Sequence, residues 1–206
     1  MSRPSARRTL ENRIRRLGFS RVAGVDEVGR GSLAGPVVAA AVVLSVNCHI
    51  KGLRDSKLLT PASRERLYDE IVKYSAAWAL GVAEASEIDR VNVHRAGLRA
   101  MSRAVRMLVP VPDFVLVDGF KIPDLLVPQK AVVKGDRSCA AIAAASIVAK
   151  VTRDRQMRGL HVVDPRYGFD RHKGYATKAH LSALVRFGYS PLHRHSFRPS
   201  ALFDRI

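Results

Sequence analysis

Apolar residues along the chain fall into short runs, and the first two runs enclose a glycine-rich turn. Residues 21–27 and 36–44 are rich in Val and Ala, a composition that suits buried strands. Several glycines separate the two runs in the stretch GVDEVGRGSLAGP. The pattern therefore predicts a β-hairpin with a glycine-rich connection.

Downstream of the hairpin, helical and strand-like segments alternate. The Thr60-Pro61 pair combines a capping residue with a first-turn proline and predicts a helix that runs to about residue 74. Asn92 is expected to cap a helix that reaches about residue 108, before two prolines. The other predicted elements are strands at 78–83, 114–118 and 131–134, an Ala-rich helix at about 137–157, and a last helix from the cap Thr177 to Gly188.

The first residues carry a helical pattern of their own. Leu10, Ile14 and Leu17 recur at helical spacing behind a candidate cap, Thr9, which predicts a short helix docked by one apolar stripe. The Arg-rich, acid-poor start is also typical of a mitochondrial transit peptide. The apolar spacing favours the docked helix.

Together these elements predict an α/β domain with a mixed sheet, because hairpin strands come first and strands alternate with helices later. A chain of 206 residues fits one large domain. We expect this domain to span 1–206, with the N-terminal helix in 1–20 and a basic helical region at about 160–206.

Composition points to a cytoplasmic protein without membrane segments. Hydrophobic residues make up 47% of the chain, and no apolar run approaches the length of a membrane span. Cys48 and Cys139 are too few for a disulfide framework and lack metal-type spacing. Both are expected to be reduced thiols.

Charge narrows the class of partner. Thirty-five Lys and Arg residues stand against 18 Asp and Glu, for a formal net charge of +17. Such a surface attracts polyanions in a salt-dependent way, and nucleic acid is the expected partner. Charge alone does not separate an enzyme from a passive binder.

Acidic residues stand at the ends of three predicted strands. Asp26 and Glu27 close the first strand, Asp118 precedes a glycine, and Asp136 precedes the Ala-rich helix. Taken singly, they are explained as arginine partners, a turn residue and a helix cap. Taken together in a basic protein, they indicate a carboxylate cluster for Mg²⁺ or Mn²⁺. Because successive strand side chains point to opposite faces, Asp26 and Glu27 are expected to converge only where the strand bends at Glu27.

Five ordered sequence blocks carry a family resemblance. They are GVDEVGRGSLAGPVVAAAVVL at 24–44, DSK at 55–57, LVDG at 116–119, GD with AAASIVAKVTRD at 135–154, and HKGYATKAH at 172–180. In this order they resemble ribonuclease HII, the type 2 ribonuclease H, over roughly residues 8–190. The resemblance implies a ribonuclease H-like fold: a five-stranded mixed sheet flanked by helices, with a C-terminal helical region. It also implies two-metal hydrolysis of RNA in RNA–DNA hybrids and incision 5′ of ribonucleotides in duplex DNA, leaving 3′-hydroxyl and 5′-phosphate ends.

The resemblance also implies roles for individual residues. Metal binding and catalysis are assigned to Asp26, Glu27, Asp118 and Asp136. The turn Gly29, Arg30, Gly31 would recognise the ribose 2′-OH, because its glycines let the backbone approach a sugar. Tyr175 would pack on the sugar of the following deoxyribonucleotide, although a surface tyrosine covering a loop is the alternative. Phosphate contacts are implied for Lys57, Ser146 and Lys150, for which solvated or capping roles are an equal alternative.

Two positions depart from the family pattern. Ser32 stands where proline usually follows the turn, and Ala176 stands where glycine often follows the tyrosine. Neither departure removes a catalytic group. The C-terminal RPSALFDRI shows no evident sliding-clamp motif. We expect a monomer without an obligate protein partner, acting on RNA–DNA hybrid and ribonucleotide-containing duplex DNA.

Two other hypotheses are weighed against this one. A non-catalytic protein that coats nucleic acid explains the net charge but not the strand-end acids, which repel phosphate unless metal is bound. A transposase-like or junction-resolving nuclease shares the acids and the metal, but the Gly-Arg-Gly turn and Tyr175 argue against it.

Overall fold

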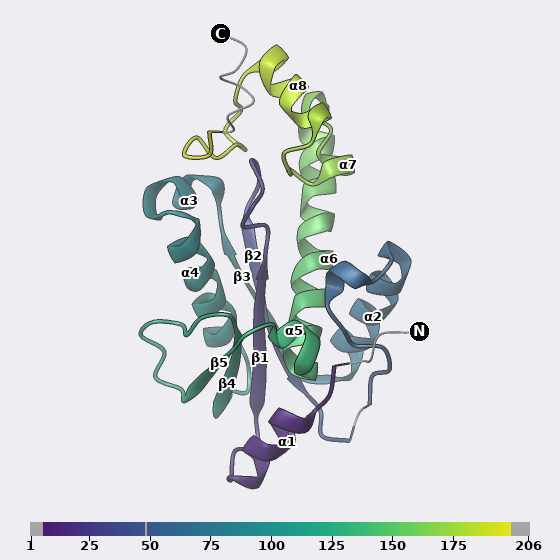
Figure 1. Ribbon diagram of the computed structural model, residues 1–206, viewed down its shortest axis with the longest axis vertical. Helices are drawn as coiled ribbons and strands as arrows, with labels where there is room; N and C mark the ends of the chain where they lie inside the picture. The colour runs from purple at the N-terminus through teal and green to yellow at the C-terminus, as the bar shows by residue number, and fades with distance from the viewer. Residues whose placement is uncertain (1–5, 48, 199–206) are drawn as a thin grey trace.

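The computed structural model describes residues 6–47 and 49–198, and its centre is a five-stranded sheet in the order β3-β2-β1-β4-β5 (Figure 1). The first three strands pair antiparallel, whereas β4 lies parallel to β1 and β5 parallel to β4. The mixed sheet flanked by helices is therefore confirmed. Its strands are β1 (Val22–Val28), β2 (Val37–Leu44), β3 (Ser75–Ala83), β4 (Phe114–Asp118) and β5 (Gln129–Val132).

Helices cover both faces of the sheet. In Figure 1 the sheet is seen almost edge-on, with α3 (Ala85–Val91) and α4 (Val93–Arg106) on one side and α2 (Pro61–Tyr74) and α6 (Ala140–Val163) on the other. Alternate residues of β1 enter the two cores: Val22 packs on the α6 side, and Ala23 and Val25 pack on the α4 side. This alternation decides which way each acid of β1 points.

The remaining elements are short. They are α1 (Thr9–Arg16), η1 (Ser56–Leu58), α5 (Gly135–Ser138), η2 (Pro165–Tyr167), α7 (Phe169–His172) and α8 (Lys178–Phe187). The C-terminal elements extend beyond the sheet beside the far end of α6 (Figure 1). None of the helices among the described residues is long and apolar enough to cross a bilayer.

Local capping signals placed three helices correctly. The side chain of Thr60 accepts a hydrogen bond from the Ser63 N–H, and α2 begins at Pro61 as predicted. Asn92 and Thr177 cap α4 and α8 in the same way, accepting from the Arg95 and His180 N–H groups. These predictions are confirmed because a capping bond joins residues only three positions apart.

The predicted Ala-rich helix is interrupted near its start. Cys139 is extended (φ −121°, ψ 121°) and forms an isolated bridge with Arg7, so α5 ends before α6 begins. The buried carboxylate of Glu11 then accepts the Ala141 N–H at 2.8 Å and caps α6 from the N-terminal segment. No local signal marks this break, because both partners lie more than 100 residues away.

Other boundaries also differ from the predictions. Thr9 is the first residue of α1 rather than its cap, and Leu17 is 73% exposed, so Ile14 is the buried anchor of the predicted stripe. The strand β3 starts three residues earlier than predicted, β5 lies two residues earlier, and the short α3 was not predicted.

The two cysteines and the chain ends complete the description. Cys139 is a buried free thiol, and burial raises its pKa well above the usual value, which agrees with a reduced, unreactive side chain. Cys48 and the residues after Arg198, which include most of RPSALFDRI, lie outside the described residues.

One glycine lets the long helix α6 approach the sheet. A Cβ at Gly24 would lie 2.1 Å from the carbonyl carbon of Ala141, a distance that no side chain tolerates. Because α6 lies this close to β1, its next turns run along the strand toward Asp26.

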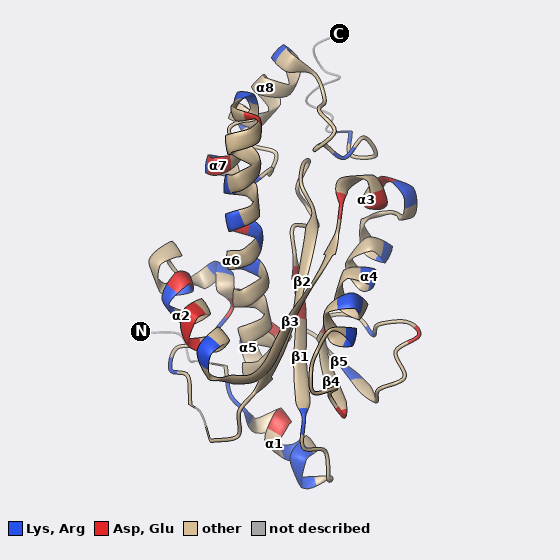
Figure 2. Ribbon diagram, turned by 180° about the vertical axis from the view of Figure 1, so that it is seen from behind, with Lys and Arg blue, Asp and Glu red and all other residues tan. Residues whose placement is uncertain are grey.

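Lys and Arg positions are spread along α6 and α4 (Figure 2), so the helices on both sides of the sheet carry positive charge.

Candidate active site

A cavity of about 400 Å³ opens at the carboxyl end of β1, where the strand turns toward β2. It brings together every predicted site residue except Lys150, and adds Val28 and Ser56. The lining residues are Asp26, Glu27, Val28, Gly29, Arg30, Gly31, Ser56, Lys57, Asp118, Asp136, Ser146 and Tyr175.

Asp26 reaches the cavity from the α6 side of β1. Its side chain accepts the Glu27 N–H at 2.7 Å, and the residue is only 7% exposed. Burial raises the pKa of Asp26 well above its usual value, and the charges of Glu27 and Asp118 raise it further. No Lys or Arg in the described part of the chain forms an ion pair with it. Within residues 6–47 and 49–198, the Asp26 carboxylate therefore has no cationic side chain paired with it.

Glu27 reaches the same cavity from the α4 side. A Cβ at Gly97 of α4 would lie 3.8 Å from Glu27 Cγ, and Arg30 Nη1 lies 3.1 Å from Glu27 Oε1. Burial raises the pKa of Glu27, and Arg30 acts in the opposite direction. The bend expected at Glu27 is absent, since Glu27 keeps regular pairing with Ala39. The acids meet because the cavity lies at the end of the strand, where side chains from both faces reach it.

Asp118 and Asp136 approach from neighbouring elements. Asp118 ends β4, and its Oδ1 accepts the Gly135 N–H at 2.7 Å, which ties the strand to the start of α5. Asp136 is 8% exposed, and burial followed by the charges of Asp55 and Asp118 raises its pKa. The cap position of α5 belongs to Lys134, so the interpretation of Asp136 as a plain helix cap is wrong.

A fifth acid, Asp55, was not recognised as a site residue from the sequence. It is 2% exposed, accepts the Lys57 N–H at 3.0 Å and lies 3.4 Å from Arg137 Nη2. Its charge acts on Asp136, as described above. The DSK block contained this signal, but only Lys57 was assigned a role.

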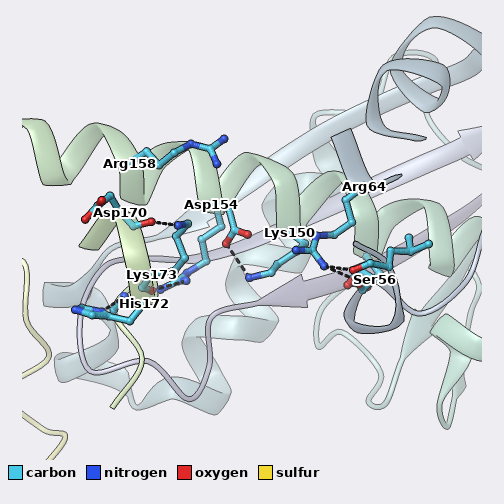
Figure 3. Close-up of polar contacts among 12 residues, drawn as sticks. Ser56, Arg64, Lys150, Asp154, Arg158, Asp170, His172 and Lys173 are labelled. Atoms are coloured by element: carbon cyan, nitrogen blue, oxygen red, sulfur yellow. Dashed lines mark hydrogen bonds and ion pairs between the residues drawn. The ribbon is translucent and has the colours of Figure 1, made fainter. Parts of the chain in front are cut away.

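The predicted phosphate contacts differ in their surroundings. Lys57 is exposed at the cavity and has no ion-pair partner in the described chain. Ser146 is buried, shares a 2.9 Å hydrogen bond with Ser56, and its hydroxyl counteracts the raised pKa of Asp26. Lys150 lies outside the lining and donates to Asp154 at 2.7 Å (Figure 3).

The glycine turn and Tyr175 also line the cavity, and an isolated bridge between Ser32 and Tyr175 joins their two segments. Gly29 has φ +93°, and a Cβ there would lie 2.2 Å from Arg153 Nε, whereas a Cβ at Gly31 would meet open space. The Tyr175 ring has Lys150 Nζ at 5.7 Å and Arg153 at 5.6 Å from its centroid. Tyr175 is therefore a half-buried aromatic held by cations at the cavity edge.

The donor set fits divalent cations in its chemistry. The cavity concentrates carboxylates, the oxygen ligands that Mg²⁺ and Mn²⁺ prefer, and Arg30 compensates only Glu27. Among the described side chains, no three of His, Cys, Asp or Glu already stand in a metal-holding arrangement.

Two buried histidines, His180 and His193, are hydrogen-bonded to each other, and His180 also binds the backbone of Tyr175. The Ser190 N–H donates to His193 Nδ1 at 3.1 Å, so the proton of this neutral ring is on Nε2, which lies 3.0 Å from His180 Nε2. His180 then donates from Nδ1 to the Tyr175 carbonyl at 3.0 Å. Burial lowers the pKa of both His180 and His193 to about 4.

This pair predicts acid sensitivity. Since the unfolded chain binds these protons near pH 6.5 and the folded chain only near pH 4, stability should fall as pH drops through that window. We expect a loss on the order of 2 kcal/mol between about pH 7 and 4.5, measured by urea unfolding. The ring resonances of His180 and His193 should not titrate above about pH 5. Titration of both near pH 6.5 would contradict the neutral pair.

Comparison with known proteins agrees with this geometry. The family model described as Ribonuclease HII matches residues 23–200. The chain is 56% identical to Ribonuclease HII of Nitrosococcus oceani, over 89% of this chain and 91% of that protein. It is 54% identical to Ribonuclease HII of Thiobacillus denitrificans, over 96% of each.

A solved structure shows the same fold. The ribonuclease H2 of Pyrococcus horikoshii superposes with a TM-score of 0.74 at 25% identity, covering 90% of this chain and 98% of that one. With the acids gathered at one strand end and the sequence matched from Ala23 onward, the chain belongs to the ribonuclease HII family, the metal-dependent endonucleases that hydrolyse the RNA strand of RNA–DNA hybrids.

Proposed function

We propose that this chain also incises duplex DNA on the 5′ side of an embedded ribonucleotide, leaving a 3′-hydroxyl and a 5′-phosphate. The observation that carries the proposal is the shared cavity, which is lined by the acids, the Gly-Arg-Gly turn and Tyr175 together. A phosphodiester seated there would have carboxylates on one side. The sugar that follows it would lie against the exposed backbone of the turn.

In this proposal Asp26, Glu27, Asp118 and Asp136 hold two divalent cations, Mg²⁺ or Mn²⁺, during catalysis. When bound, such ions stabilise both the attacking and the leaving oxygen of a phosphodiester hydrolysis. The chain supplies the acidic field that attracts them, expressed in the raised pKa of Asp26 and Asp136. The Ser146 hydroxyl and the Gly135 N–H orient the carboxylates of Asp26 and Asp118.

The turn supplies the preference for ribose. Neither the Arg30 nor the Gly31 N–H is donated to an acceptor within the described residues, and both residues line the cavity. These donors suit a 2′-oxygen, the group that distinguishes RNA from DNA at one nucleotide. The 2′-OH is recognised and is not the nucleophile, because the carboxylate cluster points to hydrolysis by water.

One cleavage assay tests the proposal. A duplex DNA with a single ribonucleotide and the matched all-DNA duplex are incubated with the protein, with and without Mg²⁺. We expect cleavage of the first duplex alone, only with Mg²⁺, at the phosphate 5′ of the ribonucleotide. Cleavage at another phosphate, or products that end in a 2′,3′-cyclic phosphate, would refute it.

Substitution of Tyr175 should separate rate from binding. Tyr175→Ala removes a ring that is fixed by two cations at the cavity edge. Because small displacements of the scissile group are costly, we expect a rate loss of about 10²-fold. Duplex affinity should change by less than about threefold, since the phosphate contacts remain. Tyr74→Ala, at the end of α2, is the control, and equal losses of rate and affinity would indicate a purely structural tyrosine.

Duplex binding should depend steeply on salt. Contacts between phosphates and a chain of net charge +17 release counterions, so affinity should fall on the order of 10²-fold or more between about 50 and 200 mM salt. Lys57→Ala should reduce the slope of log affinity against log salt by about 1. Lys73→Ala is the control, since it is close to Ser75, which pairs with Leu44 at the sheet end opposite the turn. A flat salt response would exclude the basic surface as the binding face.

A further inference from the structure

A buried arginine near the C-terminal end of the described chain, Arg194, binds the backbone of the glycine turn. Arg194 is fully buried. Its Nη2 donates to the Gly29 carbonyl at 2.7 Å and to the Gly35 carbonyl at 2.9 Å, and its Nη1 donates to the Arg30 carbonyl at 2.9 Å. Its Nε adds a second bond to Gly35 at 3.1 Å. One guanidinium thus binds two carbonyls of the turn, those of Gly29 and Arg30, and the Gly35 carbonyl that follows it.

These bonds fix the direction of the opposite edge of each peptide. In a planar trans peptide, the C=O of one residue and the N–H of the next point in opposite directions. With the carbonyls of Gly29 and Arg30 directed at the buried guanidinium, the N–H groups of Arg30 and Gly31 are directed away from it. Those are the unshared donors at the cavity.

Apart from these carbonyls, the Arg194 guanidinium contacts the Phe197 ring, 5.2 Å from its centroid. No carboxylate of the described chain forms an ion pair with Arg194, and burial lowers its pKa to about 9, so its charge is held at a cost. An apolar side chain would fill the same space without that cost but would leave the Arg30 and Gly35 carbonyls without donors, and the Gly29 carbonyl with only the Ser32 N–H at 3.4 Å. The charge is therefore retained for the carbonyls it binds.

Both the arginine and the turn are held in place by neighbouring segments. The Arg194 N–H donates to the Leu33 carbonyl, and the Gly35 N–H donates to the Leu192 carbonyl, each at 2.8 Å. Beyond the arginine, the Asp89 carboxylate of α3 accepts the N–H groups of His195 and Ser196, each at 2.9 Å. Hydrogen bonds thus hold the backbone of Arg194 and of the residues on either side of it.

We propose that Arg194 is a positioning residue for ribose recognition: it holds the Gly29 and Arg30 carbonyls inward so that the Arg30 and Gly31 N–H groups face the substrate. The proposal rests on the proposed reading of the 2′-OH by this turn. It makes specificity depend on a residue that does not touch the substrate and lies more than 160 positions from the turn.

The test compares two substrates that differ in one substituent, the group at the 2′ position of one sugar. One duplex carries a single ribonucleotide, and the other carries a 2′-fluoro nucleotide at the same position, which is similar in size but a weak hydrogen-bond acceptor. Cleavage rates are measured for the wild type, Arg194→Met and Arg194→Lys, each below its melting temperature, together with Mn²⁺ affinity. Arg103→Met is the matched control, because Arg103 binds a backbone carbonyl (Val82) and Glu87 but no residue of the turn.

We expect the wild type to prefer the ribonucleotide strongly, and Arg194→Met to lose at least about tenfold of that preference while Mn²⁺ affinity is unchanged. Arg194→Lys, whose ammonium lacks the forked geometry, should lose about threefold or more; it decides the question if Arg194→Met does not fold. Arg103→Met should keep the preference even if it lowers stability. Folded Arg194 variants with an unchanged preference would overturn the positioning role. A wild type without preference would overturn the reading of the 2′-OH itself.

Discussion

Asp26→Asn should reduce cleavage with Mg²⁺ on the order of 10³-fold or more, which corresponds to about 4 kcal/mol of transition-state stabilisation. The substitution keeps the size of the side chain and removes one anionic ligand from the acidic cavity. Asp118→Asn should behave in the same way, because Asp118 shares this cavity and contributes to the field around Asp26. Removal of metal with a chelator should produce a comparable loss in the wild type.

In the absence of metal, Asp26→Asn should be at least as stable toward unfolding as the wild type. A raised pKa means that the folded state disfavours the charged carboxylate, so the unfolded chain releases this proton more readily and stability falls as pH rises above about 4. Asp26→Asn removes that penalty, and we expect the free energy of unfolding at pH 7, measured by urea unfolding, to rise. Asp69→Asn on α2, outside the cavity, is the control. Activity of Asp26→Asn within tenfold of the wild type would refute a metal-binding role.

Gly31→Val should lower the rate on the ribonucleotide duplex by about 10²-fold while the protein stays folded. A Cβ at this position meets no protein atom within 4 Å, so the added side chain occupies only the space through which the sugar approaches. Its effect on stability should remain within about 0.5 kcal/mol. Mn²⁺ binding, followed separately, should be retained, since the acids are untouched.

The neighbouring glycine provides the contrast. Gly29→Val combines a positive φ with a Cβ only 2.2 Å from Arg153 Nε, and should therefore lose stability as well as rate. The wild type should prefer the ribonucleotide duplex over all-DNA by about 10⁴-fold, as expected of a site that pairs a substrate hydroxyl. Comparable cutting of the two duplexes would show that the turn does not read the 2′-OH.

The sequence alone determined those features that depend on neighbouring residues. The caps Thr60, Asn92 and Thr177 lie within three positions of the N–H groups they accept, so their helices were predictable. The Val- and Ala-rich runs of β1 and β2 likewise predicted their strands, and the ordered blocks identified the family. The division of the chain at about residue 160, the cytoplasmic location and the monomeric state stay predictions.

Only the tertiary structure decided which distant groups meet. The break before α6 depends on Arg7 and Glu11, which lie more than 100 residues away from it. Glu27 needs no bend, because the cavity lies at the end of β1 and is reached from both of its faces. Arg194 stands in a basic stretch like any solvated arginine, and only folding places its guanidinium under the glycine turn. Hydrogen bonds between residues remote in sequence leave no periodic or local pattern. The contacts that position this site therefore could not be predicted from the sequence and were found only in the folded structure.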